Sequence, residues 1–136
     1  MKYVFDSCVG IKALLPEVDS EKAIALLDDF KNQIHELIAP DTFPVEVAHA
    51  LTRAERKGMI QPPEAMKLLE LISNALPELH SSLPLLSRAT EISSDMKHGV
   101  YDCLLIALGE REGCQVITAD EKLAAKFPNV VTLASL

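Results

Sequence analysis

The sequence predicts an α/β domain in which a short, mainly parallel central sheet lies between two layers of helices. Short runs of β-branched and aromatic residues alternate along the whole chain with longer segments whose apolar residues recur at helical spacing. Parallel strands require crossover helices, so this alternation favours a three-layer α/β/α arrangement. The 136 residues suit one domain over residues 1–136, and they contain no linker, repeat or low-complexity segment.

The first part of the chain predicts one strand and two helices. The strand is Lys2–Phe5, and the helix after it ends at Pro16, because proline cannot continue a helix. Asp19 or Ser20 is expected to cap the second helix, since short polar side chains accept hydrogen bonds from free backbone N–H groups. The apolar face of this helix predicts its buried residues: Ala23, Leu26, Leu27 and Phe30.

The middle of the chain predicts a second strand and two further helices. The strand is Leu37–Ala39, and Asp41 or Thr42 is expected to cap the helix that follows. Gly58 marks the end of that helix, and Pro62–Pro63 opens the next one. The apolar residues at helical spacing are Val47, Ala48, Ala50, Leu51 and Ala54 in the first of these helices and Met66, Leu69 and Ile72 in the second.

The last part predicts a brief extended segment around Leu79, then three helices and two strands. The strands are short apolar runs bounded by turn residues, and the helices show apolar residues at helical spacing or a polar cap. In chain order they are a helix with Leu86, Ala89, Ile92 and Met96, a helix with Tyr101, Leu104, Leu105 and Leu108 that Gly113 ends, a strand at Cys114–Thr118, a helix at Asp120–Phe127 and a strand at Val130–Leu133.

Composition and charge exclude several classes of function. The formal net charge is −7 and aromatic residues make up 4% with no Trp, so we expect neither a general electrostatic grip on nucleic acid nor a base-stacking platform. No apolar run reaches the roughly 18 residues of a membrane span, and Asp6 interrupts the first one, so we expect no membrane segment or signal peptide. Three cysteines without C-x-x-C spacing indicate thiols in a reducing compartment, which predicts a cytoplasmic protein.

Four acidic residues follow predicted strands or lie near predicted helix starts. In an open parallel sheet, ligands and catalytic residues are found at the carboxyl ends of the strands. Asp6 directly follows the first strand, and Asp120 lies two residues beyond the strand Cys114–Thr118. Glu46 and Asp102 interrupt apolar helical surface near helix starts, where the helix dipole tolerates negative charge. Each acid alone is explained as a helix cap or first-turn acid, but four together would repel unless a cation lay between them. Hard divalent cations such as Mg²⁺ take oxygen ligands, so the pattern predicts a metal site.

Four segments resemble the sequence motifs of one protein family. They are Tyr3–Ser7 (YVFDS), Ala39–Leu51 (APDTFPVEVAHAL), Tyr101–Leu108 (YDCLLIAL) and Val116–Leu123 (VITADEKL). In this order they resemble the four blocks of the PIN domain, as found in VapC-type toxin ribonucleases, and the likeness spans residues 2–133. One block would be a weak signal, whereas four in the right order are fairly specific.

The resemblance implies a metal-dependent endoribonuclease that uses Mg²⁺ or Mn²⁺ to hydrolyse RNA. Asp6, Glu46 and Asp102 would hold the first ion, Asp120 would orient water or a second ion, and Thr118 would be a neighbouring hydroxyl. Members of this family are often homodimers, and the toxins bind a small antitoxin protein that blocks the site. The resemblance therefore also implies a homodimer and an antitoxin partner.

Two basic residues are candidates for contacts with RNA phosphates. Arg53 lies two turns after Glu46 on nearly the same helix face, and Lys12 lies on the helix after Asp6. Solvated helix surface explains both positions equally well.

Two cysteines stand where the family often has small or polar residues. Close to the acids, Cys8 and Cys103 would favour a softer metal or make activity sensitive to oxidation. The other interpretation is that both are small buried hydrophobes, as free cysteines usually are.

Other functions fit the motifs less well. A haloacid-dehalogenase-type phosphatase requires a second acid two residues after Asp6, where Cys8 stands. A di-iron bundle requires two Glu-x-x-His pairs, and the chain has one, Glu46-x-x-His49, beside an imperfect pair that ends at His98. The main alternative is a catalytically silent PIN-like module that binds RNA or protein. Acid-to-amide substitutions distinguish this module from an enzyme.

Overall fold

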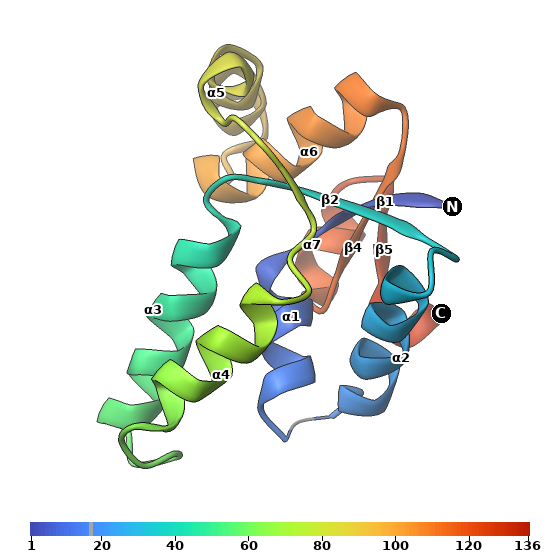
Figure 1. The fold of residues 1–136 in the computed structure, drawn as a ribbon. Helices are drawn as coiled ribbons and strands as arrows, with labels where there is room; N and C mark the ends of the chain where they lie inside the picture. Colours follow the sequence, from blue (N-terminus) through green and yellow to red (C-terminus); the bar gives the residue numbers. More distant parts are fainter. Residues whose placement is uncertain (17) are drawn as a thin grey trace.

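Five strands form one parallel sheet at the centre of the computed structural model, which describes residues 1–16 and 18–136 (Figure 1). In the spatial order β3-β2-β1-β4-β5, every pair of neighbours is parallel. The prediction of an α/β fold is confirmed, and within the described residues the sheet is wholly rather than mainly parallel. The strands are β1 (Lys2–Phe5), β2 (Glu36–Pro40), β3 (Glu78–His80), β4 (Gln115–Thr118) and β5 (Val130–Thr132).

Helices connect these strands across both faces of the sheet. None of the helices in the described part of the chain is long and apolar enough to cross a bilayer. The helices are α1 (Ser7–Leu14), α2 (Ser20–Lys31), α3 (Phe43–Arg56), α4 (Glu64–Ser73), α5 (Leu86–Met96), α6 (Val100–Glu112) and α7 (Glu121–Lys126), with short 3₁₀ turns η1 (Leu83–Leu85) and η2 (Leu133–Ser135).

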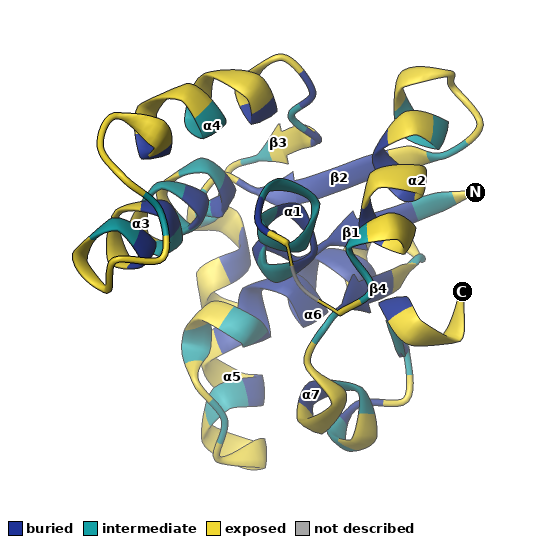
Figure 2. Cartoon of the chain, turned by 90° about the horizontal axis from the view of Figure 1, so that it is seen from below, coloured by how far each residue is buried: buried dark blue, intermediate teal, exposed yellow. Residues whose placement is uncertain are grey.

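The sheet separates two hydrophobic cores, as a three-layer fold requires. Along β1, Tyr3 and Phe5 join the core formed with α1–α4, whereas Val4 joins the core formed with α5–α7. In β4, Ile117 and Val116 divide between the two cores in the same way. Figure 2 shows the buried strands at the centre and the exposed outer faces of the helices around them. Because both faces are covered, the central strands are continuous apolar runs rather than alternating ones.

Several apolar residues that mark the predicted helices are exposed. Met66 of α4 is 60% exposed, and Tyr101 of α6 is 64% exposed. Leu86 and Met96, at the two ends of α5, are also exposed to solvent. A helical stripe is wider than the line along which two elements touch, so residues at its margins and at helix ends stay outside the core. Phe43, by contrast, was not part of the predicted apolar face and is fully buried against Phe5, with ring centroids 5.3 Å apart.

The expected side-chain caps are absent from two helices. Asp19 occupies the N-cap position of α2 with φ of 66°, and its side chain makes no capping hydrogen bond. Thr42 occupies the N-cap position of α3 in a helical conformation, and its hydroxyl bonds Glu46 instead of a backbone N–H. The Thr42 hydroxyl therefore donates to the Glu46 carboxylate and does not cap the backbone of α3.

A glycine allows α6 to lie close to the turn that leads into β4. A Cβ atom on Gly109 would lie 3.0 Å from the backbone oxygen of Cys114 and 3.3 Å from Cγ2 of Val116. The Cys114 N–H in turn donates to the Gly109 carbonyl at 3.0 Å. The approach of helix to strand therefore depends on the missing side chain.

We predict that Gly109→Ala lowers the free energy of unfolding by about 1–3 kcal/mol. Alanine gains about 1 kcal/mol of helix propensity over glycine, but the backbone oxygen it meets cannot move aside. Urea unfolding followed by circular dichroism measures the difference. Gly10→Ala is the matched control, because its Cβ would meet only the ends of the Ile72 and Phe43 side chains, each at 3.2 Å. If Gly109→Ala is as stable as Gly10→Ala, this account of the contact is wrong.

Candidate functional site

The first acid, Asp6, lies where β1 ends and α1 begins. Its exposure is 7%, and its Oδ1 accepts a hydrogen bond from the Cys8 N–H at 3.4 Å. The Asp6 N–H donates to the Ile117 carbonyl of β4 at 3.1 Å, so the neighbouring strand also holds this residue. Aspartate is a preferred N-cap because its carboxylate accepts from the free N–H groups of the first turn. A buried carboxylate is therefore fixed at the carboxyl end of the central strand.

The hydroxyl of Thr118 links Asp6 to Asp120. Thr118 ends β4, beside β1, and is fully buried. Its Oγ1 donates to Oδ2 of Asp6 at 2.8 Å and accepts from the Asp120 N–H at 3.0 Å. The structure thus places Thr118 between Asp6 and Asp120.

Asp120 is exposed and caps α7. Its Oδ1 accepts from the N–H groups of Lys122 at 2.9 Å and Leu123 at 3.3 Å. These two hydrogen bonds explain an aspartate at this position as a helix cap. No bound metal is needed for that explanation.

Glu46 lies in the first turn of α3 and accepts hydrogen bonds from two hydroxyl groups. Thr42 Oγ1 donates to Oε1 at 3.0 Å, and Ser7 Oγ donates to Oε2 at 3.4 Å. Ser7 is the first residue of α1, so this contact joins the start of α3 to the start of α1. Both hydroxyls are site residues that sequence reasoning missed. Their signals were the position of Ser7 next to Asp6 and of Thr42 one helical turn before Glu46.

Asp102 lies in the first turn of α6 and pairs with a histidine. His98 Nε2 is 2.7 Å from Oδ2 of Asp102, and the two residues lie four positions apart in the sequence. Sequence reasoning considered His98 only as part of an imperfect di-iron motif and missed this contact. The i, i+4 spacing was the available signal, but His98 precedes the helix, so helical periodicity alone did not point to it.

Burial and mutual repulsion raise the pKa of two of these carboxyl groups. For Asp6, burial is the main cause, and the Asp102 carboxylate raises the pKa further. For Glu46, burial is again the main cause, and both Asp6 and Asp102 add to the rise. Hydrogen bonds to each group oppose these effects without reversing them. Asp6, Glu46 and Asp102 therefore lie within electrostatic reach of one another.

The donor atoms suit a hard divalent cation, although the site is not closed around one. Carboxylate and hydroxyl oxygens from four helix starts face the same end of the sheet, and hard cations take oxygen ligands. As the side chains stand, no three His, Cys, Asp or Glu residues within 1–16 and 18–136 are arranged to hold a single ion. Asp6, Glu46, Asp102 and Asp120 are the residues that would hold such an ion.

Burial raises the pKa of both cysteine thiols near the acids. Burial, followed by the charge of Asp6, raises the pKa of Cys8 to about 12. Its sulfur accepts from the Ala119 N–H at 3.3 Å and lies 3.5 Å from Oγ1 of Thr118. Cys103 is fully buried, and burial raises its pKa as well. The environment of both thiols agrees with the interpretation of small buried side chains.

A hollow of about 610 Å³ opens beside Glu46. Its lining includes the exposed side chains of Val45, His49 and Tyr101, which sequence reasoning did not assign to the site. The apolar pattern of the helix predicts a buried Tyr101. The residue is exposed because it lies at the start of α6. Of the four candidate acids, Glu46 is the one that lines this hollow.

The two predicted phosphate contacts lie at the far ends of their helices. Lys12 is in the last turn of α1, and its Nζ donates to the Val18 carbonyl at 2.9 Å. Arg53 is exposed in the last turn of α3, whereas Glu46 is in the first. Their roles in RNA binding stay predictions.

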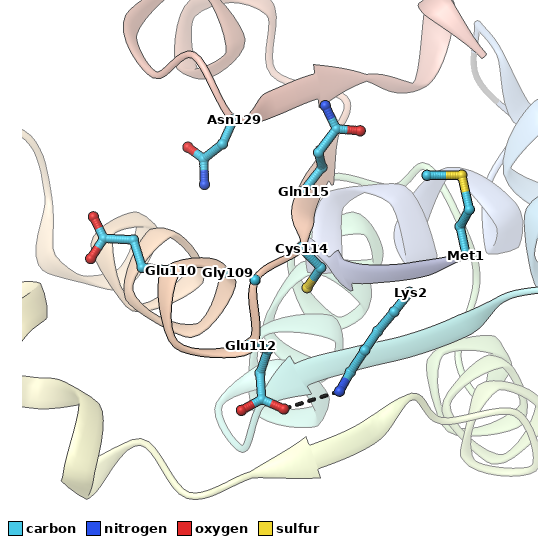
Figure 3. Close-up of a pocket in the computed structure, with 9 residues that line it drawn as sticks. Met1, Lys2, Gly109, Glu110, Glu112, Cys114, Gln115 and Asn129 are labelled. Carbon is cyan, nitrogen blue, oxygen red and sulfur yellow. Dashed lines mark hydrogen bonds and ion pairs between the residues drawn. The ribbon is translucent and has the colours of Figure 1, made fainter.

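A second hollow, of about 590 Å³, lies at the opposite end of the sheet (Figure 3). Met1 and Lys2 line it at the amino end of β1, and Lys2 Nζ donates to Oε1 of Glu112 at 3.0 Å. The acids lie at the carboxyl ends of the same strands, so this hollow is separate from the candidate site.

Comparisons with known proteins identify the family to which this fold belongs. The PIN domain family model matches residues 3–127. A protein named ribonuclease VapC3, from Pyrobaculum aerophilum, is 35% identical over 136 residues, which cover 97% of this chain and 99% of the relative.

Three solved structures show the same fold at low sequence identity. PAE2754 from Pyrobaculum aerophilum gives a TM-score of 0.78 at 17% identity, over 99% of this chain and 85% of that one. VapBC2 from Rickettsia felis, bound to a promoter DNA fragment, gives 0.69 at 14% identity, over 97% of each chain. A toxin-antitoxin complex from Klebsiella pneumoniae gives 0.67 at 16% identity, over 96% of this chain and 97% of that one. With the family model matched over most of the sequence, the chain belongs to the PIN-domain family.

Proposed function

We propose that this protein is a divalent-metal-dependent endoribonuclease of the VapC toxin type. The observation that carries the proposal is the buried Asp6 carboxylate. Burial and neighbouring carboxylates raise the pKa of Asp6 and also the pKa of Glu46. Uncompensated buried charge costs stability, so such an arrangement is expected where a cation completes it. The name of the 35% identical relative, ribonuclease VapC3, supports the same activity.

The ion that the donor set favours is Mg²⁺ or Mn²⁺, held by Asp6, Glu46 and Asp102. When bound, such an ion activates water and neutralises charge on a phosphodiester that undergoes in-line attack. Thr118 orients Asp6, and the Ser7 and Thr42 hydroxyls orient Glu46.

The remaining site residues act on water and substrate. Asp120 orients water or a second ion from the start of α7. The hollow beside Glu46 admits the RNA backbone, and Arg53 and Lys12 contact its phosphates. These roles agree with a site that is open on one side and fixed by the sheet on the other.

We also propose a small antitoxin partner and a homodimer. The Klebsiella pneumoniae structure is described as a toxin-antitoxin complex, which supports an antitoxin. In α4, Ile72 is buried and Leu68 packs against the core, whereas Leu71 and Met66 are exposed. Leu71 and Met66 point to different sides of α4, and each is an exposed apolar side chain that a second copy could cover.

Asp6→Asn is predicted to stabilise the metal-free protein at pH 7 by about 1–3 kcal/mol. The raised pKa means that native Asp6 binds its proton more tightly than the unfolded chain does. Stability is therefore lost as the pH rises from the ordinary value of 3.8 through the folded pKa. The amide carries no charge and therefore avoids this loss. It keeps the capping oxygen but replaces the Oδ2 acceptor of the Thr118 hydroxyl by an NH₂ group, which offsets part of the gain. Thermal unfolding in EDTA at pH 3.5 and pH 7 measures the effect, which should disappear at the lower pH.

Mn²⁺ should reverse this order of stability. Metal bound only by the folded state stabilises the wild type by roughly 2.7 kcal/mol at a hundredfold excess over Kd, and Asp6→Asn should gain little. Asp28→Asn, on the exposed face of α2, is the matched control and should respond as the wild type does. A wild type that gains no stability from millimolar Mn²⁺ would contradict the proposed metal site.

Replacing any one of the three proposed metal-holding acids by its amide should strongly slow RNA cleavage. With purified protein, Mn²⁺ and a labelled RNA, Asp6→Asn, Glu46→Gln and Asp102→Asn are each expected to cleave more than about 100-fold more slowly than the wild type. Asp28→Asn should cleave normally. Cleavage that survives all three changes points to a contaminating nuclease. Binding of RNA or protein without cleavage, by wild type and variants alike, indicates the silent PIN-like module.

The raised pKa of Cys8 also predicts an unreactive thiol beside the acids. A rise of its pKa from 9.0 to about 12 lowers the thiolate fraction at pH 8 about 1,000-fold. We predict that iodoacetamide modifies Cys8 of the native protein far more slowly than in 6 M guanidinium, as followed by peptide mass mapping. Rapid modification in the native state would revive the possibility of a thiophilic or redox-sensitive site.

A further inference from the structure

We propose that His98 is a positioning residue, which holds the Asp102 carboxylate in place for the metal site while Lys126 fixes the tautomer of its ring. The inference rests on the proposed function, because it concerns the same carboxylates. It assigns roles to two residues outside the four acids.

The two ring nitrogens of His98 have different partners. Nε2 lies 2.7 Å from Oδ2 of Asp102, and Nδ1 lies 3.3 Å from Nζ of Lys126. A lysine ammonium can only donate, so Nδ1 accepts and carries no proton. The proton of the neutral ring is therefore on Nε2, which donates to Asp102.

A ring contact and several hydrogen bonds hold the segment that carries His98. The imidazole lies edge-on to Phe127, with ring centroids 5.6 Å apart and an interplanar angle of 86°. The His98 N–H donates to the Ser93 carbonyl at 3.2 Å, and its own carbonyl accepts from the Ser93 hydroxyl. Lys126 Nζ also lies 3.5 Å from the Lys97 carbonyl. The link between α5 and α6 thus presents the ring in one orientation.

The geometry suits a carboxylate that must keep its charge. A neutral imidazole donor orients Asp102 without cancelling its negative charge, whereas a lysine or arginine in direct contact would neutralise it. With this bond in place, Asp102 still acts electrostatically on Asp6 and Glu46. The orientation that His98 fixes is therefore one that keeps the third carboxylate near the other two.

Without His98, Asp102 would have little to hold it. Its side chain is 39% exposed and is repelled by two neighbouring carboxylates, so an outward rotamer in water becomes favourable. Mutation of a residue that hydrogen-bonds a metal ligand commonly lowers metal affinity by about 10–100-fold. An effect of this size is expected here.

The test compares two substitutions of His98 by their affinity for Mn²⁺. His98→Phe keeps an aromatic ring against Phe127 but removes the donor, and His98→Gln places an amide donor at a similar reach. In thermal-shift titrations with Mn²⁺, we expect the Kd of His98→Phe to rise about 10–100-fold and that of His98→Gln to stay within about threefold. At saturating Mn²⁺ the RNA-cleavage rate of His98→Phe should recover most of the wild-type value.

A measurement on the unmodified protein covers the case in which His98→Phe fails to fold. In ¹⁵N NMR spectra of the wild type, His98 should show a protonated Nε2 and an unprotonated Nδ1, and Lys126→Met should weaken this preference. The Nδ1-protonated tautomer in the wild type would overturn the inference.

The outcomes distinguish this inference from the proposed function. Equal or tighter binding of Mn²⁺ by His98→Phe, with the wild type binding normally, overturns only the positioning role. A wild type that binds no Mn²⁺ overturns the proposed function and the positioning role together. Loss in His98→Phe with rescue in His98→Gln supports both.

Discussion

The hydrogen bond from Thr118 to Asp6 is the interaction on which the arrangement of the site depends. It joins the ends of the two central strands, and the same hydroxyl accepts from the N–H of Asp120. Asp6 in turn caps α1 and is held to β4 by its own N–H. A single buried hydroxyl therefore links the start of α1 to the start of α7, at the end of the backbone ladder that already pairs β1 with β4. Its geometry requires that both strands end at the same level of the sheet.

The acids are tolerated because each stands at the start of a helix. Asp6 and Asp120 cap α1 and α7, and Glu46 and Asp102 lie in the first turns of α3 and α6. Helix N-termini carry partial positive charge and favour carboxylates. This stabilisation is not sufficient for the buried ones, since the pKa values of Asp6 and Glu46 remain raised. The fold thus accepts some loss of stability to keep negative charge at one end of the sheet.

The sequence predicts the elements of this site better than its contacts. The apolar runs at Lys2–Phe5 and Cys114–Thr118 identify the central strands, and parallel topology then brings the residues after them together. The contacts of Ser7 with Glu46 and of His98 with Asp102 depend on how helix starts lie against each other, which periodicity does not encode. Tyr101 shows the same limit, because an apolar pattern assigns it to a core while the end of α6 leaves it exposed.

The net charge of −7 adds a constraint on the order of events at the proposed site. Without a cation, Asp6, Glu46 and Asp102 present negative charge to any approaching phosphate, and repulsion in a partly buried site is only weakly screened by salt. If the site acts on RNA as proposed, the backbone approaches most readily once the charge of the carboxylates is compensated. The proposed function therefore implies that the cation binds before the RNA backbone or together with it. On this argument, metal-free protein should bind RNA weakly even where its helix surfaces carry Arg53 and Lys12, and the affinity for RNA should rise with the occupancy of the metal site.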